Sequence, residues 1–290
     1  MMVQRVVFIL RSAFSRYWPL IKSLQTGLLL ATGIAGYLSA HRPQNDWHIM
    51  AGMIGSLFLT ISGSTVLNMA YDHDIDAIMQ RTCWRPLPKG LVSVREAVIL
   101  GVALSAMGMG WALALSPLYA AIVFAGLFFD AVVYTIWLKR RTPYAILIGG
   151  LAGGMPVLAG RTLAVGQIDV VGVMLALGVL FWIPTHIMTF SMRHFADYQA
   201  ARIPTFPGTY GFYITRVIIA ASSLAAALIM AGAAATIGVQ AGRLGLLGLL
   251  GVGLLALAVL GVARPSPRLS FALFKYASLY MLGAMAVVAL

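Results

Sequence analysis

Residues 68–76 of this chain read NMAYDHDID and directly follow a long apolar run. Three of the chain's eight acidic residues, Asp72, Asp74 and Asp76, lie within this stretch. Asn68, Asp72 and Asp76 are spaced four apart, so on a continuing helix their side chains would stack along one face. Asp74 lies off that face, and we expect it to pair with a neighbouring arginine. Carboxylate and amide oxygens suit Mg²⁺, which usually takes one or two carboxylates together with the phosphates of a substrate.

The composition around this stretch is that of a membrane protein. The 290 residues are 61% hydrophobic and 10% charged, and the mean hydropathy is +0.92. We expect no cleavable signal, because the arginine-bearing N-terminus leads into a span that is too long for one. The net charge of +12 is spread over short loops, which favours membrane lipids and an anionic substrate over nucleic acid. The single Cys83 excludes an internal disulfide.

Apolar segments of about twenty residues, enough to cross a bilayer core, recur along the chain. They predict an all-α fold, a polytopic membrane helical bundle of about nine transmembrane helices around a central cavity. The predicted spans are 18–40, 48–70, 93–115, 117–137, 143–161, 167–190, 214–237, 242–262 and 271–290. Since no linker or low-complexity tract divides the chain, we expect a single domain over residues 1–290.

Lys and Arg are distributed unevenly between the two sides of this bundle. One side carries Arg5, Arg11, Arg16, Lys22, Arg81, Arg85, Lys89, Arg95, Lys139, Arg140, Arg141, Arg193, Arg202, Arg216, Arg264, Arg268 and Lys275. The other carries only Arg42, Arg161 and Arg243. Because cytoplasmic loops hold an excess of Lys and Arg, the N-terminus and the motif-bearing loops are predicted to be cytoplasmic. We therefore expect an integral protein of the plasma (inner) membrane, with its C-terminus outside.

The segment after the second span, residues 81–90, reads RTCWRPLPKG. Its prolines fix an extended or turn-like path. Arg85 offers a planar fork suited to phosphate oxygens, and Arg81 and Lys89 add positive charge beside the carboxylates. Such a mixture fits a Mg²⁺-diphosphate, because the metal neutralises some oxygens and the cations hold the rest. The alternative is that these acids and bases only pair with one another at the membrane surface.

A second candidate motif, SMRHFADY at residues 191–198, follows the sixth span. If the second and sixth spans meet, Asp197 would face the first motif across a shared cavity and complete a second Mg²⁺ site. His194 and Tyr198 are candidates for proton removal or diphosphate binding. The alternative is a solvated loop with one ordinary ion pair.

A third cluster, Lys139-Arg140-Arg141, follows the fourth span. It serves either as a topology signal or as a source of cations for a diphosphate leaving group. Two ionisable residues, His186 and Asp130, lie inside predicted spans, where such side chains usually face the bundle interior or a cavity. His186 is either a satisfied interior residue or a ligand, and the sequence names no partner for Asp130.

At these residues the chain resembles the UbiA-type intramembrane prenyltransferases. That superfamily has an Asn-x3-Asp-x3-Asp motif after its second span and an acidic motif after its sixth. Within it, the chain is similar to the heme O synthases (protoheme IX farnesyltransferases) over roughly residues 60–210. The similarity is carried by Asn68, Met69, Tyr71, Asp72, Asp74–Ala77, Met79, Arg81, Thr82, Arg85–Pro88, Gly90, Tyr134, Thr135, Trp137–Pro143, Ile148–Gly150, Ala152, Gly153, Trp182, Pro184, His186, Arg193, Asp197, Tyr198, Ile203 and Pro204.

The chain departs from that group in the region expected to hold the acceptor. The group's Pro-Pro-His-Phe-Trp is replaced by PTHIM at residues 184–188, and its usual Asn is Ala145. Its Met-Pro-Pro-x-x-Gly pattern becomes MPVLAG at residues 155–160. These differences bear on the acceptor more than on the transfer of a prenyl group.

The resemblance implies Mg²⁺-dependent transfer of a farnesyl group from farnesyl diphosphate to the vinyl group of protoheme IX, giving heme O for heme–copper oxidases. The implied metal ligands are Asn68, Asp72, Asp76 and Asp197. Substrate contacts are expected from Asn68, Arg81, Arg85, Lys139, Arg140, His186, Arg193 and His194. The residues expected to be catalytic are Asp72, Asp76, Asp197 and Tyr198. A heme A synthase or an oxidase assembly factor is an expected partner.

The sequence leaves two alternatives to the transfer of a farnesyl group to protoheme IX. A prenyltransferase of the same plan would act on an aromatic acid or a quinone precursor, with the same diphosphate site and a different acceptor pocket. A secondary transporter would show paired broken helices in two related halves. The acidic motif has only a faint echo at Asp197, and no internal repeat is evident.

Overall fold

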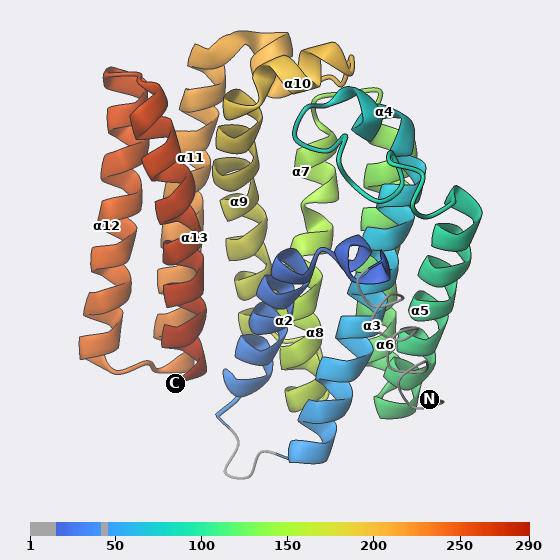
Figure 1. Cartoon of the computed structure of the whole chain (residues 1–290). Coiled ribbons are helices and arrows are strands. Elements are labelled where there is room, and N and C mark those ends of the chain that lie inside the picture. Colours follow the sequence, from blue (N-terminus) through green and yellow to red (C-terminus); the bar gives the residue numbers. More distant parts are fainter. Residues whose placement is uncertain (1–15, 42–45) are drawn as a thin grey trace, which may run out of the picture.

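Helices account for most of the described backbone, as expected where hydrocarbon forces each N–H and C=O group to find a partner within its own segment. The computed structural model describes residues 16–41 and 46–290, and no strand occurs among them. In Figure 1 the long helices run side by side between two ends of the molecule. The helices are η1 (Trp18–Ile21), α2 (Ser23–Leu38), α3 (Trp47–Tyr71), α4 (His73–Ile78), α5 (Val94–Leu115), α6 (Pro117–Leu127), η2 (Phe128–Leu138), α7 (Ala145–Gly149), α8 (Leu151–Val165), α9 (Val170–Arg193), α10 (Phe195–Ala200), α11 (Phe206–Ile237), α12 (Ala241–Ala263) and α13 (Pro267–Ala289).

The membrane-spanning plan agrees closely with the predicted spans. Eight stretches of the described chain are long and apolar enough to cross a membrane. The first predicted span is occupied by η1 and α2, and α2 is shorter, at 16 residues. The seventh span begins earlier than predicted, at Phe206, because α11 continues through a kink at Gly211, whose φ is 80°. The C-terminus lies at the end of the bundle away from α4 and α10 (Figure 1).

Polar side chains at the helix ends fix where several spans begin. Ser93 and Glu96 form a capping box at the start of α5. Ser116 caps α6, with Pro117 in the first turn, and this one residue between α5 and α6 makes the pair a tight hairpin. Asp169 caps α9 by accepting a hydrogen bond from Gly172 N.

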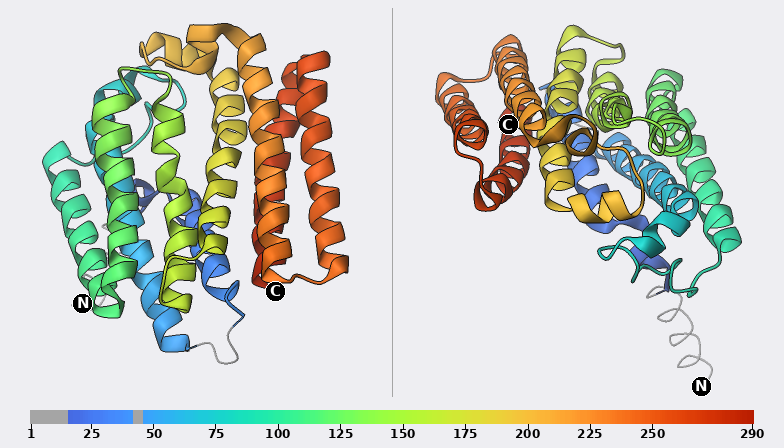
Figure 2. Two further views of the ribbon diagram at one scale, coloured as in Figure 1. Left: turned by 180° about the vertical axis from the view of Figure 1, so that it is seen from behind. Right: turned by 90° about the horizontal axis from the view of Figure 1, so that it is seen from above.

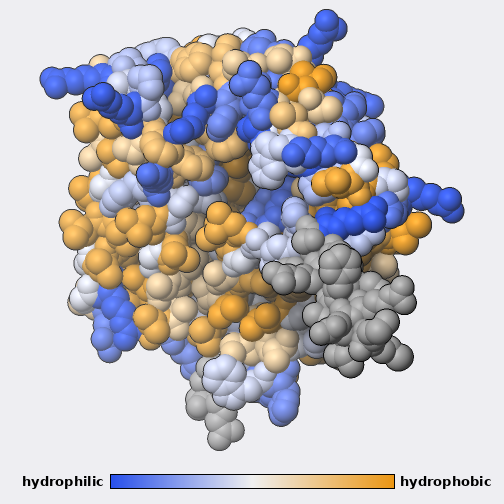
Figure 3. All heavy atoms as spheres, in the orientation of Figure 1, coloured by the Kyte–Doolittle hydropathy of each residue, from blue (hydrophilic) through white to orange (hydrophobic). Residues whose placement is uncertain are grey.

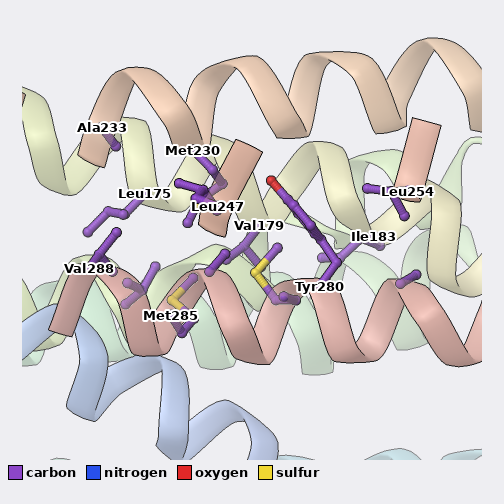
Figure 4. Close-up of a cluster of buried hydrophobic side chains, with 14 of the residues drawn as sticks. Leu175, Val179, Ile183, Met230, Ala233, Leu247, Leu254, Tyr280, Met285 and Val288 are labelled. Carbon is purple, nitrogen blue, oxygen red and sulfur yellow. The ribbon is translucent and has the colours of Figure 1, made fainter. Parts of the chain in front are cut away.

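Seen along the bundle, α11, α12 and α13 form one side and α5 and α6 the other, with α2 and α3 between them (Figure 2). The largest apolar core belongs to the C-terminal side. There, side chains of α9, α11, α12 and α13 interdigitate around the fully buried Tyr280, with Met230, Leu247 and Leu254 facing it from the neighbouring helices (Figure 4). A second core joins α2, α3, α6 and α8. The polar residues of interest lie where these two sides meet.

The helices α2 and α8 approach each other through glycines. A Cβ atom added at Gly36 would lie 2.1 Å from Val157 O, and one added at Gly160 would lie 2.0 Å from Gly33 O. Real side chains never come so close, so only glycine permits this contact.

A largely buried ion pair between Arg161 and Asp169 joins three helices at one end of the bundle. Arg161 on α8 donates from Nε and Nη2 to the Asp169 carboxylate, at 2.8–2.9 Å, and from Nη1 to Ser39 O at 2.7 Å. These bonds join α8 to the start of α9 and to the end of α2. Because every charged group in the cluster has a partner, this end is held firmly.

The α2–α8 contact gives a stability prediction. Substituting Gly36→Ala should lower the melting temperature in detergent by several degrees, since overpacking costs about 1–3 kcal/mol. Gly27→Ala on the same helix is the control, because a Cβ there meets no atom within 4 Å. Its melting temperature should stay equal or rise, since alanine favours helix by about 1 kcal/mol. Equal behaviour of the two variants would contradict the close contact.

Candidate functional site

The helix α3 ends inside the acidic motif, yet the one-turn spacing of its ligand-type residues survives the break. Asp72 leaves helical geometry (φ −91°, ψ 5°), and α4 starts at the next residue. The backbone N–H of Asp72 still donates to Asn68 O at 3.0 Å, and that of Asp76 donates to Asp72 O at 2.8 Å. The three residues are 8%, 1% and 3% exposed, in chain order. They therefore form a buried ladder of oxygens, as the spacing predicted.

Cations from other elements pair with this ladder. Lys139, just after η2, donates to Asp72 Oδ2, which also accepts from Asn68 Nδ2 at 3.1 Å. Arg85 Nη1 donates to Asp76 Oδ2 at 2.6 Å. Pairing of acids with bases is thus present in the absence of any ligand. Burying ion pairs is weakly stabilising at best, so stability alone gives little reason to gather four charges here.

Asp74 behaves as the motif's off-face member. Its carboxylate is half exposed and accepts two hydrogen bonds of 2.7 Å from Arg140. These bonds hold the pKa of Asp74 down at about 2. Arg140 also donates to Tyr71 O at 2.8 Å and lies 3.7 Å from Asp72 Oδ1. The predicted pairing of Asp74 with an arginine is confirmed.

Lys22 is a site residue that the sequence analysis counted only toward topology. It joins η1 to α2 in a left-handed backbone conformation (φ 47°), which is uncommon outside glycine. Its Nζ donates to Asn68 Oδ1 at 2.8 Å, and it interacts electrostatically with Asp72 and Asp130. A signal was available, because Lys22 falls inside the predicted span 18–40, where a charge implies a function by default.

The second acidic motif lies against the loop that follows the first. Asp197 Oδ1 accepts from Gln80 N at 3.1 Å, and Asp197 Oδ2 accepts from Arg81 N at 3.4 Å. Arg81 Nη2 donates to the Tyr198 hydroxyl at 3.4 Å. The second motif therefore contacts the loop after the first motif, through the backbone N–H groups of residues 80 and 81. This contact differs from the predicted one, in which Asp197 faces the first motif across a cavity. Within residues 16–41 and 46–290, no three His, Cys, Asp or Glu side chains cluster closely enough to hold a metal ion by themselves.

An aromatic column runs from Arg81 into the bundle along α9 and α13. Arg81 lies over the ring of Phe190, 5.1 Å from its centroid, and Phe190 contacts Phe274 with centroids 5.8 Å apart. His186 is stacked between Phe274 and Trp182, at 4.5 and 4.8 Å. Ser278 Oγ lies 3.3 Å from His186 Nδ1. We call Trp182, His186, Phe190 and Phe274 the aromatic column.

The other two predicted contacts of this region flank the column. Arg193 lies over the ring of Phe271, at 4.0 Å, and Lys275 lies over the same ring at 4.5 Å. His194 packs against Phe190 with centroids 4.5 Å apart. Burial, with Arg81 nearby, lowers the pKa of His194. Positive charge therefore gathers at the end of the column where the acidic motifs lie.

A small cavity of about 50 Å³ separates α9 from η2 and α7. Its lining includes Lys139, Tyr134 and Tyr198 beside Ile187, Met188 and Ala145. Figure 3 shows that one face of the molecule is hollowed beside α9. Three of the positions that depart from the heme O synthase pattern thus line this space. Two other departing positions lie elsewhere. Thr185 makes a hydrogen bond with Ser223 Oγ on α11 at 2.8 Å, and Val157 is fully buried where α8 meets α2.

The oxygens of the ladder fit a magnesium ion. Asp72 Oδ1 is buried without a hydrogen-bond partner, although the other oxygen of the same carboxylate has two. A buried acceptor of this kind is costly unless a ligand uses it. Carboxylate and amide oxygens together with substrate phosphates are the set that Mg²⁺ prefers.

The chain is similar to known proteins along most of its length. The model of the UbiA prenyltransferase family matches residues 29–282. The protoheme IX farnesyltransferase of Korarchaeum cryptofilum is 42% identical over 71% of this chain and 69% of its own. Among solved structures, a digeranylgeranylglyceryl phosphate synthase has a TM-score of 0.80 at 18% identity, covering 95% of this chain and 97% of its own. A UbiA homolog from Archaeoglobus fulgidus bound to GPP and Mg²⁺ has a TM-score of 0.71 at 16% identity, covering 95% and 100%.

The two likenesses agree with each other. The matched region contains the described site residues from Asn68 to Lys275 but not Lys22, and both solved structures share the helical arrangement. The chain belongs to the UbiA prenyltransferase family.

Proposed function

We propose that this protein transfers a farnesyl group from farnesyl diphosphate to the vinyl group of protoheme IX, giving heme O. The observation that carries the proposal is the buried oxygen ladder, with cations around it, beside the aromatic column. The first group suits a metal-bound diphosphate and the second a flat conjugated acceptor. The relative from Korarchaeum cryptofilum, a protoheme IX farnesyltransferase, supports the choice of both substrates.

In this proposal Asn68, Asp72 and Asp76 would hold Mg²⁺, and Asp197 would hold a second ion by releasing its two backbone N–H partners. The Mg²⁺ of the related Archaeoglobus fulgidus protein supports this assignment. When bound, the metal neutralises charge that develops on the diphosphate as its bond to the farnesyl carbon breaks.

The cations that now pair with the ladder would move to the diphosphate. Lys139, Arg85 and Lys22 each donate to a ladder oxygen, so a metal on those oxygens releases their N–H groups toward the phosphates. Arg140 and Arg81 would complete the grip, with the Tyr198 hydroxyl and His194 beside Arg81. Preorganised donors of this kind stabilise the departing charge.

The acceptor half of the reaction is assigned to the aromatic column. A porphyrin would lie against its rings, with His186 contacting the macrocycle or its iron. Arg193 and Lys275, which flank Phe271, would take the propionates. The apolar surroundings keep water from the allylic cation until the vinyl group attacks it. We place the reaction in the plasma (inner) membrane with the acidic motifs toward the cytoplasm, and its product with a heme A synthase or an oxidase assembly factor.

The function is tested by supplying purified protein in detergent with Mg²⁺, farnesyl diphosphate and protoheme IX. Extraction and mass analysis should reveal a farnesylated, hydroxylated heme, and chelation of Mg²⁺ should abolish it. A product formed only with an aromatic acid or a quinone precursor would overturn the heme assignment while keeping prenyl transfer. The absence of any prenylated product would overturn both.

The ladder gives a matched pair of variants. Asp72→Asn should lower the rate of product formation by about 100-fold or more, because it removes a ligand oxygen beside the developing charge. Asp74→Asn should lower it less than about fivefold, because an exposed ion pair is worth about 0–1 kcal/mol. Initial rates of product formation at saturating concentrations of both substrates measure the two effects. Equal losses in the two variants would contradict the assignment of the metal face.

His186 gives a prediction for the acceptor. His186→Ala should raise the KM for protoheme IX about tenfold, since each lost aromatic stack is worth about 0.5–1.5 kcal/mol. The affinity for farnesyl diphosphate should not change, because the side chain of His186 contacts Trp182, Phe274 and Ser278 and no residue of the ladder. Steady-state kinetics with each substrate varied in turn measures both effects. If only the KM for farnesyl diphosphate rises, His186 belongs to the diphosphate site and the assignment to the acceptor site is wrong.

A further inference from the structure

The intramembrane carboxylate of Asp130, which has no part in the scheme above, has a defined place beneath the diphosphate site. Ser64 Oγ on α3 donates to Asp130 Oδ2 at 2.5 Å. Ser64 lies four residues before Asn68, and therefore one helical turn, about 6 Å, deeper along the same face. The carboxylate thus continues the ladder into the apolar part of the bundle.

The wide helix η2 explains why Asp130 and Lys139 serve the same space. In an α-helix nine residues make two and a half turns, which would place them on opposite sides. η2 is a π-helix, with the i→i+5 bond from Lys139 N to Tyr134 O at 2.9 Å. Its wider turn, roughly four and a half residues, returns nine residues to the same side.

The neighbours of η2 agree with this geometry. Tyr134 and Lys139 line the small cavity beside α9, whereas Phe128, Ala131 and Val132 line a separate apolar crevice against α5. Asp130 interacts electrostatically with Tyr134 and Lys22, and so belongs to the first group. It is half-buried, and among the described residues its Oδ1 makes no hydrogen bond. That oxygen is free to accept a proton.

The proposed reaction needs such an acceptor. When the allylic carbon bonds to the vinyl terminus, the diphosphate leaves with the electron pair of the broken C–O bond, and the positive charge moves to the other vinyl carbon. A water oxygen then forms a bond to that carbon, and one proton must leave the water. Asp197 and the ladder carboxylates are assigned to metal ions, so they are not available for this step.

We propose that Asp130 is the catalytic base of the acceptor half-reaction, taking the proton from the water that adds to the farnesylated vinyl group. Ser64 holds the carboxylate in place through Oδ2 and leaves Oδ1 for the water. Without this base, the cation would lose a proton from an adjacent carbon instead, giving a product that lacks the elements of water. The inference rests on the proposed function.

The test compares Asp130→Asn with Ser64→Ala in the heme assay. Asp130→Asn keeps the size and polarity of the side chain but removes its basicity, so hydrated product should form about 100-fold more slowly or worse. The remaining product should shift toward the form lacking water. Ser64→Ala keeps the carboxylate, and its loss should stay below about tenfold, as expected for one hydrogen bond.

Three results would overturn the assignment of Asp130. The first is that Asp130→Asn forms hydrated product at a rate within about threefold of that of the unchanged protein. The second is that both variants lose the same fraction of this rate. The third is that Asp130→Asn binds farnesyl diphosphate less tightly. Asp130→Glu, which restores a base, should recover part of the rate of hydrated product formation. If Asp130→Glu has an unchanged melting temperature and does not recover this rate, the assignment of Asp130 is also contradicted. If the unchanged protein makes no farnesylated heme, the proposed function fails instead.

Discussion

The buried carboxylate of Asp72 is the constraint on which this structure depends. A charge that is 1% exposed inside a helical bundle must be matched by cations, and none is available on its own helix. The match comes from Lys139 after η2, with Lys22 before α2 reaching the same ladder through Asn68. The packing of η2 and α2 against α3 is thereby tied to the chemistry of the site. In the function proposed above, these same cations would bind the diphosphate, so the groups that neutralise Asp72 are also those that the substrate requires.

The same constraint divides the molecule into two chemical halves. The ladder and its cations lie at the end of the bundle near α4 and α10, while the aromatic column descends along α9 and α13. Arg81 connects them, because its backbone binds Asp197 and its side chain covers Phe190. In the proposed reaction, the diphosphate ionises where charge is available and the farnesyl group couples to its acceptor in apolar surroundings. The two regions that would serve these steps lie side by side.

The sequence predicted the bundle and the ladder well because both depend on local periodicity. Apolar runs identified the spans, and the four-residue spacing identified Asn68, Asp72 and Asp76 and set Asp74 apart. Lys22 was missed because its role depends on a left-handed turn and on a contact 46 residues away. Asp130 had no nameable partner because its contact with Ser64 joins two helices and spans 66 residues, and because only the π-helical turn puts it on the same side of η2 as Lys139. Non-local packing and an unusual helical pitch are not encoded in residue spacing alone.

The ion pair between Arg161 and Asp169 makes one end of the bundle different from the end that carries the acidic motifs. Its bonds are internal and complete, and they involve no group that the reaction uses. At the opposite end, the contacts between elements include the ion pairs of Asp72 and Asp76, which the proposed function would transfer to a diphosphate. The packing of the end that carries Arg161 therefore does not depend on the charge state of the acidic motifs.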